Sequence, residues 1–306
     1  MQPFVYFGTS ERPAEYKQSP GLDHATVFLA FTSTEFERHQ KEFDHMLLLR
    51  HEDPQYRVYV MVHFLKAEWR SKMVIQDGRF YVQFFTQHSF EPAWDKSYWK
   101  APPRVKPSHA PAPWTWDIQP DFTYWLTAQD FSVSECIVAA VTYVECFSAS
   151  PYFTIEFEND THTLRSQDER GDVHSPAVKR LAAAGAIALY NRFLLWERAR
   201  QHDSTDWNVT PEETIRHFGL TVHQHLYTFW VFRPHFDVHW KWAGCGMAYL
   251  TFGKFNSNTW GLIRFADWIN EIHRWGMTVH APAVKEEVNV CLKAERPIRL
   301  WPIVLA

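Results

Sequence analysis

Three acidic residues next to strand-like segments have the types and spacing to bind a metal ion. Asp121 follows Pro120 at the start of one such segment, and Glu156 and Glu158 alternate with apolar residues at the end of a second. Carboxylates at one edge of a sheet can hold a hard divalent cation such as Mg²⁺, which prefers oxygen ligands and keeps waters that can act as nucleophiles. The same alternation also suits a half-exposed strand that carries no site.

A run of histidines offers a second chemistry. His223 and His225 are spaced to share one face of a strand and could bind zinc. The chain has 17 histidines and 15 tryptophans, so its general enrichment in these residues explains the run equally well. A zinc-stabilised interaction protein is therefore one reading of the sequence. The run consists of His217, His223, His225, His235 and His239.

Positive charge for a phosphate partner is local. Residues 179–200 carry five basic side chains against one acidic, beginning with Lys179 and Arg180. Nucleic-acid-binding proteins usually show such a basic footprint. The whole chain has 31 basic and 35 acidic residues, and its net charge of −4 argues against tight non-specific binding. A solvated helix face explains the basic run about as well.

Length and composition indicate a globular protein with a sizeable core. The chain has 306 residues, of which 46% are hydrophobic and 17% aromatic, which excludes collagen-like, coiled-coil and disordered classes. The four cysteines are scattered and form no C-x-x-C pair. The sequence shows neither an apolar run long enough to cross a bilayer nor a signal peptide. We expect an intracellular protein, nuclear or cytoplasmic.

The elements that must position the acidic residues fall into two parts. Residues 1–100 read as an N-terminal α+β extension: a helix from a capping box at residues 34–37 to about Arg50, a strand over 56–65, and a hairpin over 73–85 around Asp77-Gly78. Residues 101–120 hold six prolines and predict an extended connector.

Residues 121–306 read as an α/β domain. The pattern predicts an Ala-rich helix over 177–200, opened by Ser175 and Pro176, that packs closely on a sheet. Other strands are expected at 121–126, 152–157, 226–232 and 247–255, and other helices at 134–146, 260–275 and 283–292, with a short helix after Thr210.

The PD-(D/E)XK nuclease superfamily has a strand with Pro-Asp, a strand with Glu-x-Lys, a helix and a strand in this order, and the chain resembles it with Pro120-Asp121 and Glu156-Phe157-Glu158 at the two motif positions. Three longer strings, PYFTIEFE (151–158), AAAGAIALYNR (182–192) and DWINEIHRWG (267–276), are similar to the fungal PD-(D/E)XK nuclease-like proteins. The resemblance spans roughly residues 110–292. It implies a restriction-endonuclease-like mixed sheet flanked by helices.

The resemblance assigns Asp121 and Glu156 as metal ligands. Glu158 stands where the family has the Lys that orients the attacking water and stabilises charge developing on the scissile phosphate. A carboxylate there can bind metal or take a proton from water. Alternatively, Lys179 or Arg180 supplies the cation from the neighbouring helix.

The sequence therefore predicts a nuclease that uses Mg²⁺ or Mn²⁺ to hydrolyse DNA, and less readily RNA. We expect no membrane partner, and a homodimer is a possible assembly. The alternative is a catalytically weakened nuclease-like domain that binds nucleic acid or a protein partner. In both readings, Lys179 and Arg180 are the expected nucleic-acid contacts.

Overall fold

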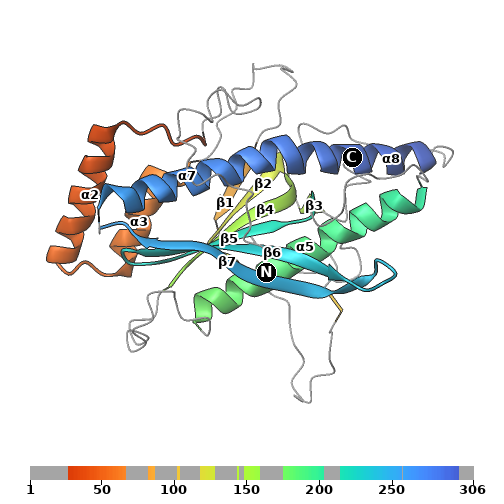
Figure 1. The fold of residues 1–306 in the computed structure, drawn as a ribbon, viewed down its shortest axis with the longest axis horizontal. Helices are drawn as coiled ribbons and strands as arrows, with labels where there is room; N and C mark the ends of the chain where they lie inside the picture. Colours follow the sequence, from red (N-terminus) through yellow and green to blue (C-terminus); the bar gives the residue numbers. More distant parts are fainter. Residues whose placement is uncertain are drawn as a thin grey trace, which may run out of the picture.

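The computed structural model describes residues 27–66, 82–86, 102–103, 118–127, 143–144, 148–158, 175–202, 214–256 and 258–295. These residues form an α/β fold in which helices flank one mixed sheet (Figure 1). Within the described residues, no helix is long and apolar enough to span a membrane.

The sheet has the strand order β1-β2-β4-β5-β6-β7, with β3 paired beside β4. Only the β4–β5 pair is parallel, and the chain between these two strands includes helix α5, which packs against both. All other strand pairs are antiparallel. The strands are β1 (Val82–Thr86), β2 (Phe122–Thr127), β3 (Tyr143–Val144), β4 (Ser148–Phe157), β5 (His217–His223), β6 (Leu226–Phe236) and β7 (Trp242–Lys254).

The helices lie on both faces of the sheet. Figure 1 shows α7 and α8 as one rod across one face, α5 on the other, and the α2–α3 pair at one end. A π-helical turn, η3, joins α7 to α8. The helices are α2 (Ser33–Leu48), α3 (Asp53–Phe64), α5 (Pro176–His202), α7 (Thr259–Trp275), η3 (Gly276–His280) and α8 (Ala281–Glu295).

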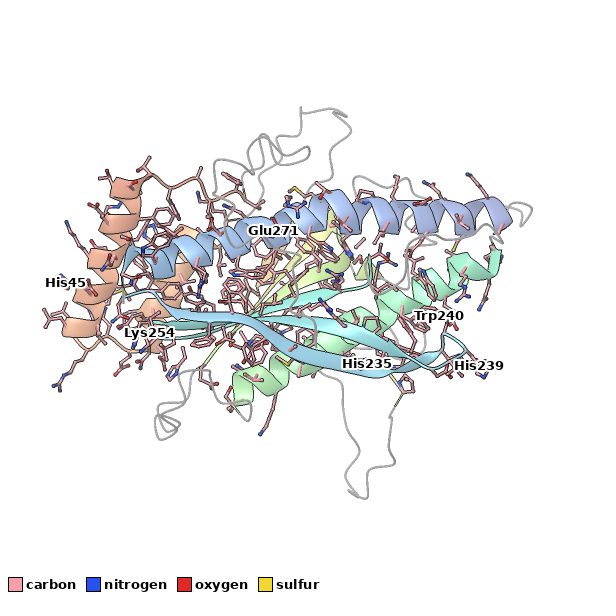
Figure 2. The ribbon with its side chains drawn as sticks, in the orientation of Figure 1. His45, His235, His239, Trp240, Lys254 and Glu271 are labelled. Carbon is pink, nitrogen blue, oxygen red and sulfur yellow. The ribbon has the colours of Figure 1, made fainter. Side chains whose placement is uncertain are left out.

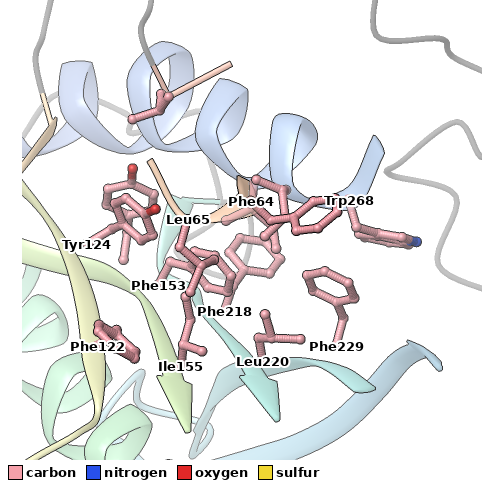
Figure 3. Close-up of a cluster of buried hydrophobic side chains, with 14 of the residues drawn as sticks. Phe64, Leu65, Phe122, Tyr124, Phe153, Ile155, Phe218, Leu220, Phe229 and Trp268 are labelled. Atoms are coloured by element: carbon pink, nitrogen blue, oxygen red, sulfur yellow. The ribbon is translucent and has the colours of Figure 1, made fainter. Parts of the chain in front are cut away.

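The largest core lies on the α7 face of the sheet. There Phe153, Ile155 and Leu220 from β4 and β5 pack with side chains of α7 such as Trp268 (Figure 3). Phe64 of α3 belongs to the same cluster. Helices α2 and α3 therefore share a hydrophobic core with the sheet.

Helix α5 packs closely on the opposite face, as its Ala-rich sequence predicts. A Cβ atom at Gly185 would lie 2.9 Å from the Phe232 ring, and one at Gly219 would lie 2.7 Å from Leu181. Both positions therefore favour glycine. The predicted start is confirmed as well, because the Ser175 hydroxyl accepts a hydrogen bond from the Val178 N–H at 3.2 Å.

The strand predicted over residues 56–65 is wrong, because this segment lies in helix α3. Its β-branched and aromatic residues favour a strand by propensity, but Tyr56, Val60 and Phe64 recur every four residues and are all buried. Pro54, in the first turn, has the fixed φ angle that a helix start accepts. Tertiary packing on one helical face outweighs the intrinsic preference.

Other elements differ in detail from the prediction. Helix α2 is capped by Thr32 with Glu35, not by Thr34, and strand β5 was not predicted. β4, β6 and β7 are longer than expected. The sequence predicts a helix over 134–146, but the two described residues of this segment, 143–144, form the short strand β3. The predicted turn at Asp77-Gly78 and the cap at Thr210 lie outside the described residues.

Candidate functional site

Asp121 lies immediately before β2, next to Glu156 of β4. Phe122 pairs with Ile155 in the antiparallel register, and both side chains join the core on the α7 face. Because side chains alternate along a strand, the flanking residues Asp121 and Glu156 face the α5 side. The Phe157 N–H donates to Asp121 Oδ2 at 2.8 Å, while Asp121 Oδ1 lies 2.9 Å from an Arg57 nitrogen.

The Glu156 side chain is fully buried and only partly paired. Its Oε2 accepts a hydrogen bond from Arg180 Nε at 2.8 Å, whereas Oε1 has no hydrogen-bond partner. Burial raises the pKa of Glu156 to about 8, and the nearby Asp121 adds to that rise although Arg180 opposes it. The pKa of Glu156 therefore lies well above that of an exposed carboxyl group.

Glu158 lies just beyond the end of β4 and is also buried. Its Oε2 accepts a long hydrogen bond, 3.4 Å, from the Ala177 N–H in the first turn of α5. Its backbone N–H donates to the Val222 carbonyl at 2.9 Å, which extends the β4–β5 pairing. The strand and the helix start thus fix Glu158 beside the other two acids.

Arg180 is the cation that α5 contributes. It lies against Glu156, donates to the Phe157 carbonyl oxygen at 3.2 Å, and interacts electrostatically with Asp121 and Glu158. Its side chain remains 39% exposed. Lys179, the other residue suggested by the sequence, is exposed. Of the two, the structure brings Arg180 to the carboxylates.

Arg57 is a site residue that the sequence reasoning missed. It comes from α3, and its guanidinium lies 5.2 Å from the Phe122 ring centroid and 5.4 Å from that of Phe157. Assigning residues 56–65 to a strand hid it. Reading the same segment as a helix would have shown Arg57 one turn after Asp53.

The carboxylate site is the name used below for five side chains that lie together: Asp121, Glu156, Glu158, Arg57 and Arg180. Its oxygen donors suit Mg²⁺, and the unpaired Oε1 of buried Glu156 is a free ligand atom next to Asp121. Within the described residues, no group of three or more His, Cys, Asp and Glu side chains is placed to hold a metal ion. A magnesium ion held by one or two carboxylates and its own waters fits these residues.

The five histidines predicted as a possible zinc cluster do not gather in one place. His217 is buried under α5, and a turn at Gln224 separates His223 from His225, so these two do not share a strand face. His235 and His239 lie near the tip of the β6–β7 hairpin (Figure 2). The chain folds back between the members of the run, which spacing alone does not reveal.

A second buried polar group, called the histidine cluster, lies towards the other end of β4. Short contacts join Ser150 Oγ to His280 Nε2 at 2.9 Å, Tyr152 Oη to His273 Nδ1 at 2.8 Å, and Thr154 Oγ1 to His217 Nε2 at 2.9 Å. Burial lowers the pKa of all three histidines, to about 3 for His217 and His273. These rings are neutral at physiological pH.

Comparisons with protein-family models, with curated proteins and with solved structures each find no match to this chain.

Proposed function

We propose that the carboxylate site performs metal-dependent hydrolysis of phosphodiester bonds, with DNA as the preferred substrate over RNA. The observation that carries this proposal is the placement of Asp121 and Glu156 on one face of neighbouring strands, with Arg180 beside both. Two carboxylates can hold a divalent metal ion, and a neighbouring cation can stabilise the charge that develops on a phosphate.

Each residue of the carboxylate site has its own role in the proposed hydrolysis. Asp121 and Glu156 would hold Mg²⁺ or Mn²⁺, which when bound supplies charge stabilisation and an acidic water. Glu158 accepts a proton from the attacking water. Arg180 stabilises the charge that develops on the scissile phosphate, the role that the resemblance assigns to the missing lysine. Lys179, exposed on the same turn of α5, contacts the nucleic-acid backbone.

The topology supports a restriction-endonuclease-like fold. The antiparallel β2–β4 pair carries the acids, and the parallel β4–β5 pair flanks a chain segment that contains α5. That order is the one implied by the sequence resemblance.

Cleavage assays with single- and double-stranded DNA and RNA test the proposal. Wild type is expected to cleave with Mg²⁺ or Mn²⁺ and to stop when the metal is chelated. Asp121→Asn and Glu156→Gln should each lower the rate by about a hundredfold or more. Exposed Glu286 provides the matched control, and Glu286→Gln should leave the rate unchanged. Metal-dependent cleavage that survives both changes would refute the assignment.

A second candidate function is a weakened nuclease-like module that binds nucleic acid without cutting it. Arg57 and Arg180 already neutralise Asp121 and Glu156, and Glu158 replaces the lysine. In that case wild type is inert in every cleavage assay yet binds labelled DNA in fluorescence anisotropy, with an affinity that falls as salt rises. Lys179→Met should then weaken binding, and Glu158→Lys is expected to restore some cleavage.

A further inference from the structure

Residues 237–241, called the hairpin tip below, join β6 to β7 and hold two large apolar side chains in solvent. Val238 is 91% exposed and Trp240 is 40% exposed. Figure 2 shows Trp240 and His239 at this tip, beside the last turns of α5. Single apolar side chains on a surface are normal, whereas two in one tight turn indicate a contact with a partner.

Hydrogen bonds within the turn hold the hairpin tip in place. The carboxylate oxygen Oδ1 of Asp237 accepts from the backbone N–H groups of His239 at 2.8 Å and Lys241 at 2.9 Å. The Trp240 N–H donates to the Asp237 carbonyl oxygen at 3.0 Å, and the Asp237 N–H donates to the Lys241 carbonyl oxygen at 2.9 Å. The carboxylate of Asp237 is therefore directed to the turn itself, and the exposed side chains lie on a preorganised backbone.

Trp240 occupies a backbone position that favours glycine. Its φ angle is 60°, in the left-handed region, which a bulky side chain rarely adopts. Hairpin turns usually place glycine or asparagine at such a position, because a Cβ atom there strains the backbone. The fold thus keeps a partly exposed tryptophan where glycine would relieve strain. That pattern is typical of a residue that is retained for binding.

The Trp240 ring is only partly covered by its own chain. The Phe236 ring centroid lies 5.8 Å from that of Trp240. The Arg200 guanidinium carbon lies 5.9 Å from the Trp240 ring centroid and 5.3 Å from that of Trp196. These contacts orient the ring without enclosing it. The exposed part of the ring can therefore stack against a planar group of a partner.

Basic side chains lie around the hairpin tip. Residues 197–202 and 233–241 together hold four basic and two acidic residues, whereas the whole chain has a net charge of −4. Arg200 and Lys241 are both exposed. An aromatic ring beside exposed cations fits a nucleic-acid base and its neighbouring phosphates. Insertion of the same turn into lipid would bury the charge of Asp237, which is costly.

We propose that the hairpin tip binds single-stranded nucleic acid, with Trp240 stacking on a base and Arg200 and Lys241 contacting phosphates. Nucleic acid as the occupant rests on the proposed function, because α5 carries both Arg180 of the carboxylate site and Arg200 beside the hairpin tip. Arg180 and Arg200 are 20 residues apart, which is about 30 Å along a helix. About nine stacked nucleotides span that length, so one strand can contact both places.

Fluorescence anisotropy of a labelled oligo-dT strand of about 20 nucleotides tests the proposal, with EDTA present so that metal-dependent cleavage cannot occur. Trp240→Ala should weaken binding by about fivefold or more, and Trp240→Phe should retain most of the affinity. Lys241→Met should lower the slope of log affinity against log salt by about 0.7. The matched control is Trp260→Ala, which removes a tryptophan that is 73% exposed at the start of α7 and should leave the affinity unchanged.

Absence of DNA binding by wild type would overturn the proposal, as would an equal loss of affinity in Trp240→Ala and Trp260→Ala, or none in Trp240→Ala. Loss of binding by Trp240→Ala to vesicles of phosphatidylserine and phosphatidylcholine, but not to the oligonucleotide, would assign the hairpin tip to a membrane instead. Should Trp240→Ala fail to fold, an unchanged salt slope for Lys241→Met contradicts the proposal.

Addition of Mg²⁺ to the same mixtures tests the proposed function separately. Binding that depends on Trp240, without cleavage, supports the role of the hairpin tip and contradicts the nuclease activity. Cleavage together with binding that does not depend on Trp240 supports the nuclease activity and contradicts the role of the hairpin tip.

Discussion

The two ends of β4 bury polar groups in opposite ways. At the carboxylate site, charged side chains pair with arginines that reach solvent, since Arg57 is 23% and Arg180 39% exposed, and one oxygen of Glu156 is left unpaired. In the histidine cluster, neutral rings contact hydroxyl groups of β4, and all of them are closed off from water. Burial of titratable residues is common to both ends, so burial alone does not mark function.

The carboxylate site differs from the histidine cluster because its arginine partners are in contact with solvent. A half-exposed arginine can turn into solvent without disturbing the core, whereas the ring of His280, packed beside Trp275, cannot leave without opening the core. The histidine cluster is therefore part of the scaffold. Four measurements test this contrast.

At constant, neutral pH, the largest effect of a single substitution is expected at the Arg192–Glu287 ion pair, which joins α5 to α8 beside the histidine cluster. Both side chains are almost fully buried and make two hydrogen bonds. Glu287→Ala leaves the Arg192 charge buried and unpaired, and should lower the free energy of unfolding by about 3–5 kcal/mol. Urea denaturation measures it. Glu286→Ala, on the exposed side of α8, should change it by less than about 0.5 kcal/mol.

The histidine cluster should make the fold sensitive to acid. The pKa of His217 and of His273 is about 3 in the folded chain, below the ordinary value of 6.5, so the unfolded chain binds more protons. Their contribution to stability is present above pH 6.5 and is lost as pH falls towards 3, by about 1.4 kcal/mol per pH unit for each ring. Unfolding free energies at several pH values check this, and His217→Gln should flatten the profile.

Glu156 should show the opposite trend. Its pKa is raised from 4.5 to about 8, so its contribution to stability is present below pH 4.5 and is lost as pH rises through 8. The amide introduced by Glu156→Gln has no proton to lose in this pH range. Its stability relative to wild type should therefore increase between pH 5 and 8 by up to about 1.4 kcal/mol per pH unit. Parallel pH profiles of the two proteins would contradict the raised pKa.

The smallest effect is expected at Lys179. Its side chain is exposed, so Lys179→Met should change the free energy of unfolding by less than about 0.5 kcal/mol. Arg180→Met, one residue along, removes the partner of buried Glu156 and should cost more, about 1–3 kcal/mol. Equal thermal stability of the two variants would show that the Arg180 contact contributes nothing.

The sequence was informative where local pattern and tertiary structure agree. β2, β4, α5 and α7 follow from alternation, capping and helical spacing, and they suffice to bring Asp121 next to Glu156. The prediction from sequence failed where long-range packing determines the secondary structure. Strand β5 begins and ends in histidine and contains Gly219, a poor strand former that is needed here because Leu181 presses on the backbone. Arg57 was hidden because α3 resembles a strand in composition.

The π turn between α7 and α8 depends on the exact number of residues in that part of the chain. A π turn holds one more residue than an α turn, which rotates everything after it by about 100° relative to a regular helix. That rotation determines which side of α8 carries Glu287 towards Arg192. Loss of a single residue from 276–280 would make the rod of Figure 1 a more regular helix but turn Glu287 away from its partner. Homologous chains should therefore keep the residue count across this turn even where their loops vary in length.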